Sequence, residues 1–185
     1  GSKIEAALAG TTTGTFEFVG DFTNVYDNYA RLIWIDSGTG GGRLAVGGAN
    51  ASGNVRFALN GGYHDSTYAR EGQGRHVYHV VFDSTNAVEV DRLQLYVDGV
   101  YQESFGTGVL LNETANSIGG REFWVGNRAG SSRTYLGTLY YAAVYSKALT
   151  PSAIATNSAI LIANDDGPNP CAGGSTVGDS CPGGT

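Results

Sequence analysis

The sequence is dominated by short segments in which apolar and polar residues alternate, and glycine-rich turns separate these segments. Successive side chains of an extended strand point to opposite faces, so this alternation is what a strand with one buried face requires. Repetition at intervals of roughly 8–12 residues favours an antiparallel sandwich or barrel over a parallel α/β sheet. The segments predicted as strands are residues 15–19, 31–35, 43–47, 55–59, 76–82, 93–97, 100–103, 122–126 and 138–145.

Two turn signals support this pattern. Asp98-Gly99 suits a type I′ hairpin, in which both central residues need positive φ, and Asn60-Gly61-Gly62 is a strong turn signal after residues 55–59. The 185 residues include 29 Gly, and 41% of them are hydrophobic. Because the glycines are spread between apolar runs without a collagen-like period, they predict many turns in a chain with a sizeable core.

One helix is predicted, over residues 151–163. Thr150 is a good N-cap, Pro151 suits the first helical position, and residues 164–167 form a stop signal. The helix should pack against an edge of the sandwich through the stripe formed by Ile154, Ser158, Leu161 and Ile162. The predicted fold class is therefore all-β: a two-sheet antiparallel β-sandwich of the jelly-roll type with one short C-terminal helix.

Charge and hydropathy exclude two kinds of partner. The net charge is −6, so no broad positive field is available for binding nucleic acid. No apolar run approaches the roughly 18–20 residues that span a bilayer, and we expect no membrane insertion.

The sequence divides into three parts. Residues 1–10, which begin with Gly1-Ser2, are expected to be a cloning remnant and a lead-in, and residues 11–163 the domain. Residues 164–185 are predicted to be a Gly/Pro-rich linker tail of a longer parent chain. A disulfide between Cys171 and Cys181 is favoured over free thiols, since a metal site normally needs four ligands.

Residues 76–83 and 93–100 (HVYHVVFD and LQLYVDGV), followed by 123–126 and 135–154, resemble the laminin-G-like, concanavalin A-like lectin/glucanase jelly rolls. The resemblance spans roughly residues 15–160 and implies the fold more firmly than an activity. The sequence departs from the family pattern in two places. Tyr140-Tyr141 stands where many relatives have acidic residues that help to hold calcium, and Arg75 or Tyr78 stands where a Trp is usual.

An enzyme is not expected. Retaining glucanases need two carboxylates about 5–5.5 Å apart, and the nearest candidates are Glu89 and Asp91. The third acidic residue of the glucanase pattern is missing, and we interpret the segment as a solvated loop before a strand. His76 and His79 should point to opposite faces of their strand, so they are not expected to chelate a metal together.

Two segments combine aromatic, acidic, amide and cationic side chains, the groups that recognise sugars. Residues 60–70 are expected to form a loop with Tyr63, Asp65 and Tyr68 as candidate ligand-binding residues; residues 127–135 add Asn127 and Arg128. Both segments could border one face of the sandwich. Trp34 and Trp124 are expected in the core instead. Calcium is a possible cofactor, and its site is left open among Asp21, Asp27, Asp36, Asp165 and Asp166.

The leading hypothesis is a non-catalytic glycan-binding or adhesion module of a larger extracellular, cell-surface or phage tail protein, which would place it outside the cell or on a virion. Its partner would be a glycan or a surface protein. One alternative is a structural or protein-interaction domain without sugar specificity, and the other is a glycoside hydrolase.

Overall fold

The computed structural model describes residues 7–21, 30–36, 44–48, 54–69, 74–109, 111–115, 122–126, 135 and 137–163. The described elements are β1 (Thr13–Asp21), β2 (Arg31–Asp36), β3 (Leu44–Gly48), β4 (Asn54–Leu59), β5 (Gly62–Ala69), β6 (Arg75–Asp83), the 3₁₀ turn η1 (Glu89–Arg92), β7 (Leu93–Val97), β8 (Val100–Ser104), β9 (Glu122–Val125), β10 (Thr138–Tyr145) and the helix α2 (Pro151–Ala163).

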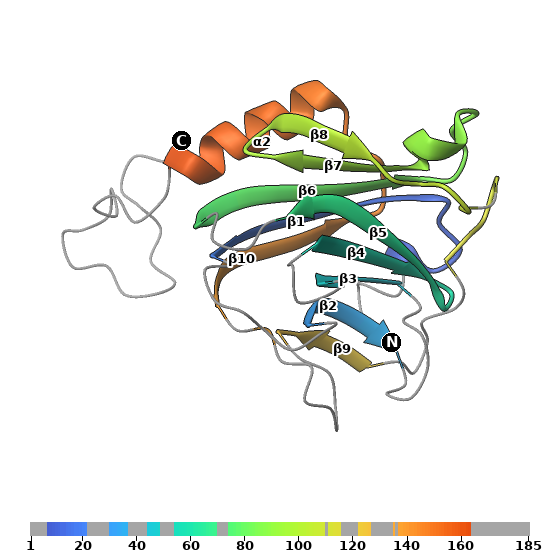
Figure 1. Cartoon of the computed structure of the whole chain (residues 1–185), viewed down its shortest axis with the longest axis horizontal. Coiled ribbons are helices and arrows are strands. Elements are labelled where there is room, and N and C mark those ends of the chain that lie inside the picture. Colours follow the sequence, from blue (N-terminus) through green and yellow to red (C-terminus); the bar gives the residue numbers. More distant parts are fainter. Residues whose placement is uncertain are drawn as a thin grey trace.

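The described strands form two antiparallel five-stranded sheets that pack face to face (Figure 1). Sheet A has the order β10-β1-β6-β7-β8, and sheet B has the order β5-β4-β3-β2-β9. The helix α2 lies on the outer side of sheet A (Figure 1). The predicted two-sheet β-sandwich with one short C-terminal helix is confirmed.

The core fills the space between the inner faces of the sheets. Alternate residues of β1 and β6 face it from sheet A, and Phe57 of β4 faces them from sheet B. Aromatic rings carry much of this contact: Phe18 stacks on Tyr78 at 5.1 Å between centroids, and Phe57 stacks on Phe82 at 5.4 Å. Each buried aromatic or aliphatic side chain contributes about 1.5–3 kcal/mol through removal of its surface from water.

The turn predictions at the two hairpins are confirmed. Asp98 and Gly99 have φ of 52° and 81°, and Asn60 and Gly61 have φ of 49° and 94°. Both pairs therefore adopt the left-handed conformations that a two-residue hairpin requires.

The prediction of a loop over residues 60–70 is wrong, because Gly62–Ala69 form β5, an edge strand of sheet B. The strand is polar, so it lacks the alternation that identified the others. The segment before β7 is also more ordered than the predicted loop, since Glu89–Arg92 form a 3₁₀ turn.

The helix α2 begins as predicted. The Thr150 hydroxyl accepts a hydrogen bond from the N–H of Ala153 at 3.2 Å, which caps the first turn. Ile154 and Ser158 of the predicted stripe are buried, and Ile154 packs on Val81 and Tyr96. Ile162 departs from the prediction because its side chain is 49% exposed. No helix in the described part of the chain is long and apolar enough to cross a membrane.

Candidate functional site

The helix α2 packs on the outer face of sheet A, whereas the candidate site lies on the outer face of sheet B. Five residues form one row across this face, because each is paired with the next between neighbouring strands: Trp124, Trp34, Ala45, Ala58 and Tyr63. The small alanines in the middle separate the aromatic residues at the two ends.

The side chains in the middle of this row are buried and not accessible to a ligand. Trp34, Ala45 and Ala58 are buried and form a cluster of their own, against which Trp124 packs in part. The guanidinium of Arg31, also buried, lies over the Trp34 ring at 3.9 Å from its centroid. Trp34 is thus buried as predicted, although in this outer cluster and not between the sheets.

The row is open at the β5 edge, where Arg56, Tyr63 and Asp65 form what we call the Arg56 platform. Arg56 lies opposite Asp65 in the β4–β5 register, and its Nε and Nη2 each donate to one carboxylate oxygen at 2.5 Å. The guanidinium also lies 4.7 Å from the centroid of the Tyr63 ring. Tyr63 itself remains 43% exposed.

The platform combines the group types that bind sugars. Tyr63 offers an aromatic ring to the C–H face of a sugar, and the carboxylate of Asp65 can accept hydrogen bonds from hydroxyls. The bidentate pair with Arg56 fixes both charged groups in orientation and balances their charge. This arrangement suits a neutral, hydroxyl-rich ligand on a shallow surface.

The strand that carries the platform is held to sheet A by a carboxylate. Glu103 of β8 accepts hydrogen bonds from the backbone N–H of Thr67 at 3.1 Å, the Thr67 hydroxyl at 2.8 Å and the N–H of Tyr68 at 2.8 Å. These bonds satisfy backbone donors at the edge of sheet B, which would otherwise be open to another strand.

Tyr68, the third candidate on this segment, does not join the platform. A bulge in the β4–β5 pairing separates Asp65 from the end of β5, and Tyr68 packs against the main core from the other face. Burial, followed by the negative charge of Asp98, raises the pKa of Tyr68 above its usual value of 10.0.

The remaining predicted site residues lie outside the described part of the chain. These are Asn127, Arg128, the calcium candidates Asp27, Asp165 and Asp166, and the two cysteines Cys171 and Cys181. The strand before Asn127 is β9, which forms the edge of sheet B opposite to β5. Within the described residues, no group of three or more His, Cys, Asp or Glu side chains could hold a metal ion.

The carboxylates of Glu89 and Asp91 accept hydrogen bonds that hold neighbouring turns in place. Glu89 accepts a hydrogen bond from the N–H of Gly108 at 2.8 Å, and Asp91 accepts one from the Ser104 hydroxyl at 2.6 Å. Both carboxylates stand on η1 and not on a strand face, so they hold neighbouring turns in place.

A second polar cluster is buried between sheet A and α2. Glu17 accepts hydrogen bonds from His79 at 2.7 Å, Asn157 at 2.8 Å and Tyr145 at 2.8 Å. Burial alone would raise the pKa of Glu17, but these three hydrogen bonds and the charge of His79 outweigh it, so the pKa falls below its ordinary value of 4.5. His79 faces α2, whereas His76 pairs with Asp98, so the two histidines do not converge, as predicted.

Comparison with known families agrees with this architecture. Residues 3–155 match the family described as the concanavalin A-like lectin/glucanases superfamily. No curated protein matches the sequence.

Among solved structures, a heptameric pentraxin from Limulus polyphemus is 14% identical with a TM-score of 0.61, over 80% of this chain and 70% of the pentraxin. Trypanosoma rangeli sialidase is 15% identical with a TM-score of 0.57, over 83% of this chain but only 23% of the sialidase. A candidate carbohydrate binding protein from Bacteroides ovatus is 14% identical with a TM-score of 0.58, over 78% of this chain and 40% of that protein. At these identities the likeness establishes the fold alone.

Proposed function

Because this chain belongs to the concanavalin A-like lectin/glucanase superfamily, we propose that it is a module that binds glycans and does not cleave them. The observation that carries the proposal is the Arg56 platform. It presents an exposed aromatic ring beside an oriented carboxylate, on a face of the sandwich that α2 leaves uncovered.

The proposal that the module does not cleave glycans is supported by the hydrogen bonds that the nearest candidate carboxylates already make. Hydrolysis with retention needs a nucleophile and an acid at a shared site. Glu89 and Asp91, the nearest candidates in sequence, hold turns around η1, and Asp65 is engaged by Arg56.

We propose further that the module works outside the cell or on a virion, in adhesion, as one part of a longer chain. The sialidase gives a precedent for the modular part, because the likeness covers only 23% of that protein.

A second candidate function is protein interaction. It is favoured by the edge strand β8, where Val100 is 62% exposed and Tyr101 is 50% exposed on neighbouring positions. Exposed apolar groups on an unpaired edge can pair with another chain.

A glycan array and affinity electrophoresis, each run with calcium and with a chelator, test the glycan-binding proposal. We expect saturable binding to at least one neutral glycan, and weaker binding by Tyr63→Ala. Contacts between two aromatic side chains contribute about 0.5–1.5 kcal/mol, and a sugar–ring contact of similar strength corresponds to a loss of up to roughly tenfold in affinity.

Tyr101→Ala is the matched control, because it removes a similarly exposed tyrosine from the other sheet. Its affinity should equal that of the unchanged protein. The proposal is rejected if no glycan binds to the folded domain. The platform is rejected as the site if Tyr63→Ala and Tyr101→Ala bind equally well.

A further inference from the structure

The strand β10 forms an open edge of sheet A (Figure 1). Within the described part of the chain it pairs with β1 alone, so backbone N–H and C=O groups along its other side have no partner strand. The opposite edge of the same sheet is tied to sheet B, because Glu103 of β8 accepts hydrogen bonds from Thr67 and Tyr68 of β5. The two edges of sheet A therefore differ in how open they are to another strand.

The strand β10 lacks the features that usually keep edge strands from pairing. Such edges are commonly short, or they carry a charged residue or a proline. β10 is eight residues long, and its sequence, TLYYAAVY, contains neither. A bulge opposite Val19 and Gly20 disturbs only its beginning, so residues 141–145 keep a regular register with β1. This regular, uncharged edge can accept a further strand.

Exposed apolar side chains surround this edge. Tyr140 and Tyr141 of β10 are 44% and 40% exposed, and Ile160 and Ile162 of α2 are about half-exposed. Tyr141 and Ile160 line one hollow of about 160 Å³ between β10 and α2. We call β10 together with these four side chains the β10 surface. Apolar groups beside an open edge favour contact with another protein over contact with water.

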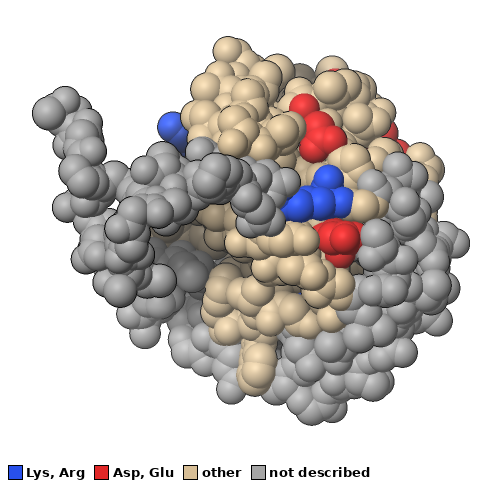
Figure 2. All heavy atoms as spheres, turned by 90° about the vertical axis from the view of Figure 1, so that its left-hand side faces the viewer, with Lys and Arg blue, Asp and Glu red and all other residues tan. Residues whose placement is uncertain are grey.

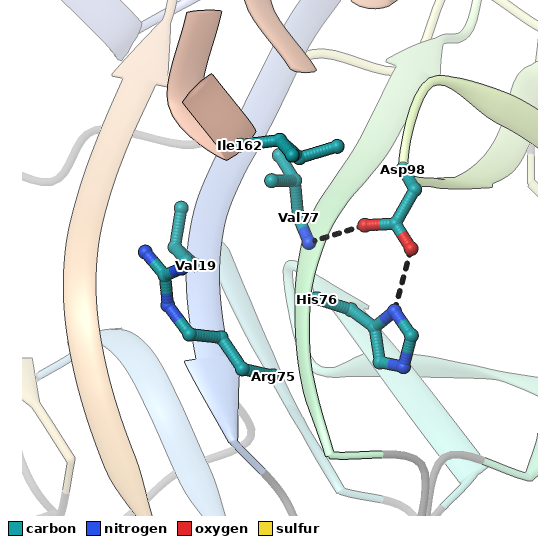
Figure 3. A pocket seen from close by; sticks show the side chains of 6 residues that line it. All are labelled: Val19, Arg75, His76, Val77, Asp98 and Ile162. Carbon is teal, nitrogen blue, oxygen red and sulfur yellow. Dashed lines mark hydrogen bonds and ion pairs between the residues drawn. The ribbon is translucent and has the colours of Figure 1, made fainter. Parts of the chain in front are cut away.

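Side chains of neighbouring strands hold the beginning of the β10 surface in place. The Arg75 side chain extends past Val19 toward β10 (Figure 3), and its guanidinium lies 4.5 Å from the centroid of the Tyr140 ring. Val19 lies opposite Tyr141 in the β1–β10 register, and with Ile162 it lines a small cavity beside this edge. Side chains that are already fixed lose less conformational entropy when a partner binds.

The charge pattern favours a second copy of this chain as the partner. The chain has a net charge of −6, so two copies repel each other on average. Neither β10 nor α2 contains a charged residue, and the described surface at the end where α2 finishes is mostly uncharged (Figure 2). Two copies can therefore meet at the β10 surface without repulsion between like charges, whereas a strongly charged partner finds no opposite charge on either element.

We infer that β10 pairs antiparallel with β10 of a second copy around a two-fold axis, and that the pairing is centred on Ala142. In this arrangement each edge supplies the hydrogen-bond partners that the other lacks. Tyr141 and Ala143 point to the same face of β10, because side chains alternate along a strand. With Ala142 at the centre, Tyr141 of each copy lies opposite Ala143 of the other, so a large side chain meets a small one.

Pairing of this kind has a consequence for binding. The two-fold axis is perpendicular to sheet A, so the outer faces of both copies of sheet B point to the same side. The two Arg56 platforms can then contact one glycan-bearing surface together, which raises the overall affinity without any new contact. This consequence rests on the proposed function, whereas the pairing of β10 does not.

The size of the β10 surface predicts a weak dimer. At roughly 150–250 Å² for a whole aromatic side chain, the exposed parts of Tyr140 and Tyr141 amount to about 130–210 Å². The isoleucines, the alanines and the edge backbone add to this area, and a stable interface buries about 800 Å² per partner. We therefore expect a dimer that dissociates on dilution.

Sedimentation equilibrium of the full chain over a range of concentrations tests the inference. We expect monomer and dimer in equilibrium, with a dimer fraction that rises with concentration. Ala142→Lys should raise the dissociation constant of the dimer by about fivefold or more, because it places two like charges directly opposite each other. Tyr101→Lys is the matched control, since it adds one positive charge at an exposed position on β8, the other edge of sheet A, and it should leave the constant unchanged.

Mixing Ala142→Lys with Ala142→Glu separates loss of pairing from loss of folding. Ala142 is exposed, so both variants should stay folded. A mixed dimer pairs opposite charges across the two-fold axis, so it should form more tightly than the dimer of either variant alone. The inference is overturned if the chain remains monomeric at every concentration, if Tyr101→Lys weakens the dimer as much as Ala142→Lys does, or if the mixture associates no better than the single variants.

Discussion

Replacing Glu17 with Gln should destabilise the domain more than most single substitutions, because Glu17 joins sheet A to α2. Its side chain is almost fully buried and accepts hydrogen bonds from His79, Asn157 and Tyr145. Hydrogen bonds to a charged group are roughly twice as strong as neutral ones, with net values of about 1.5–3 kcal/mol each.

Glutamine can keep these contacts only as neutral hydrogen bonds. Losing about half the strength of three such bonds amounts to roughly 2–4 kcal/mol, and the lower desolvation cost of an amide offsets part of this loss. We expect the free energy of unfolding to fall by about 2 kcal/mol at neutral pH. For a domain of this size that corresponds to a decrease in Tm of roughly 4–8 °C.

The effect should depend on pH in a defined direction. Since folding lowers the pKa of Glu17 below 4.5, its contribution to stability is complete above that pH and is lost as the pH falls through the lowered value. The difference between the unchanged protein and Glu17→Gln should therefore be constant near neutrality and shrink in acid.

Urea unfolding followed by tryptophan fluorescence, at neutral pH and at about pH 3, measures both effects. Glu103→Gln is the matched control, since Glu103 also accepts three hydrogen bonds but is only half-buried; it should lose about 1 kcal/mol. The reasoning fails if Glu17→Gln unfolds within about 0.5 kcal/mol of the unchanged protein at neutral pH, or if the gap stays the same in acid.

Substitutions at three further positions test other parts of the structure. Gly137→Ala should cost about 1–3 kcal/mol in thermal unfolding, because a Cβ at this position would lie 2.2 Å from the carbonyl oxygen of Asp21; an unchanged Tm would contradict the close approach. Thr150→Ala should cost about 1 kcal/mol by loss of the N-cap, whereas Thr150→Ser should recover most of it. Burial, with the hydrogen bond to Glu17 and its charge, raises the pKa of Tyr145 above 10.0, so the stability that Tyr145 contributes is present below pH 10 and is lost as pH rises through the raised value. Tyr145→Phe should remove this component from alkaline unfolding curves, and identical curves would argue against it.

The strands that face the core were predictable because each has one apolar side. In β6, for example, Tyr78 and Phe82 face the core while His79 faces α2, and the segment alternates accordingly. The edge strand β5 was not predicted because most of its residues are polar and its main contacts to other strands are polar. Arg56 and Glu103, which lie on other strands, engage its side chains and backbone.

The candidate site was predictable in part for a related reason. The sequence identified Tyr63 and Asp65 by their chemistry, but it missed Arg56. A two-residue hairpin at Asn60-Gly61 fixes the register of the strands around it, and this register sets Arg56 directly opposite Asp65. A hairpin centred on Asn60-Gly61 predicts the pairing of Arg56 with Asp65, because this pairing depends on sequence position and not on hydrophobicity.

A cavity of about 210 Å³ beside the start of β6 could not have been predicted in this way, since its lining residues come from segments that lie far apart in the chain. Arg75 of β6 lines it and stacks on Tyr140 of β10. Ile162 of α2 also lines it and lies five residues after Asn157, which donates a hydrogen bond to Glu17. Asn157 and Ile162 are parts of one helix. A change that releases Asn157 should therefore also move Ile162, so the stability of the buried Glu17 cluster and the shape of the cavity are coupled.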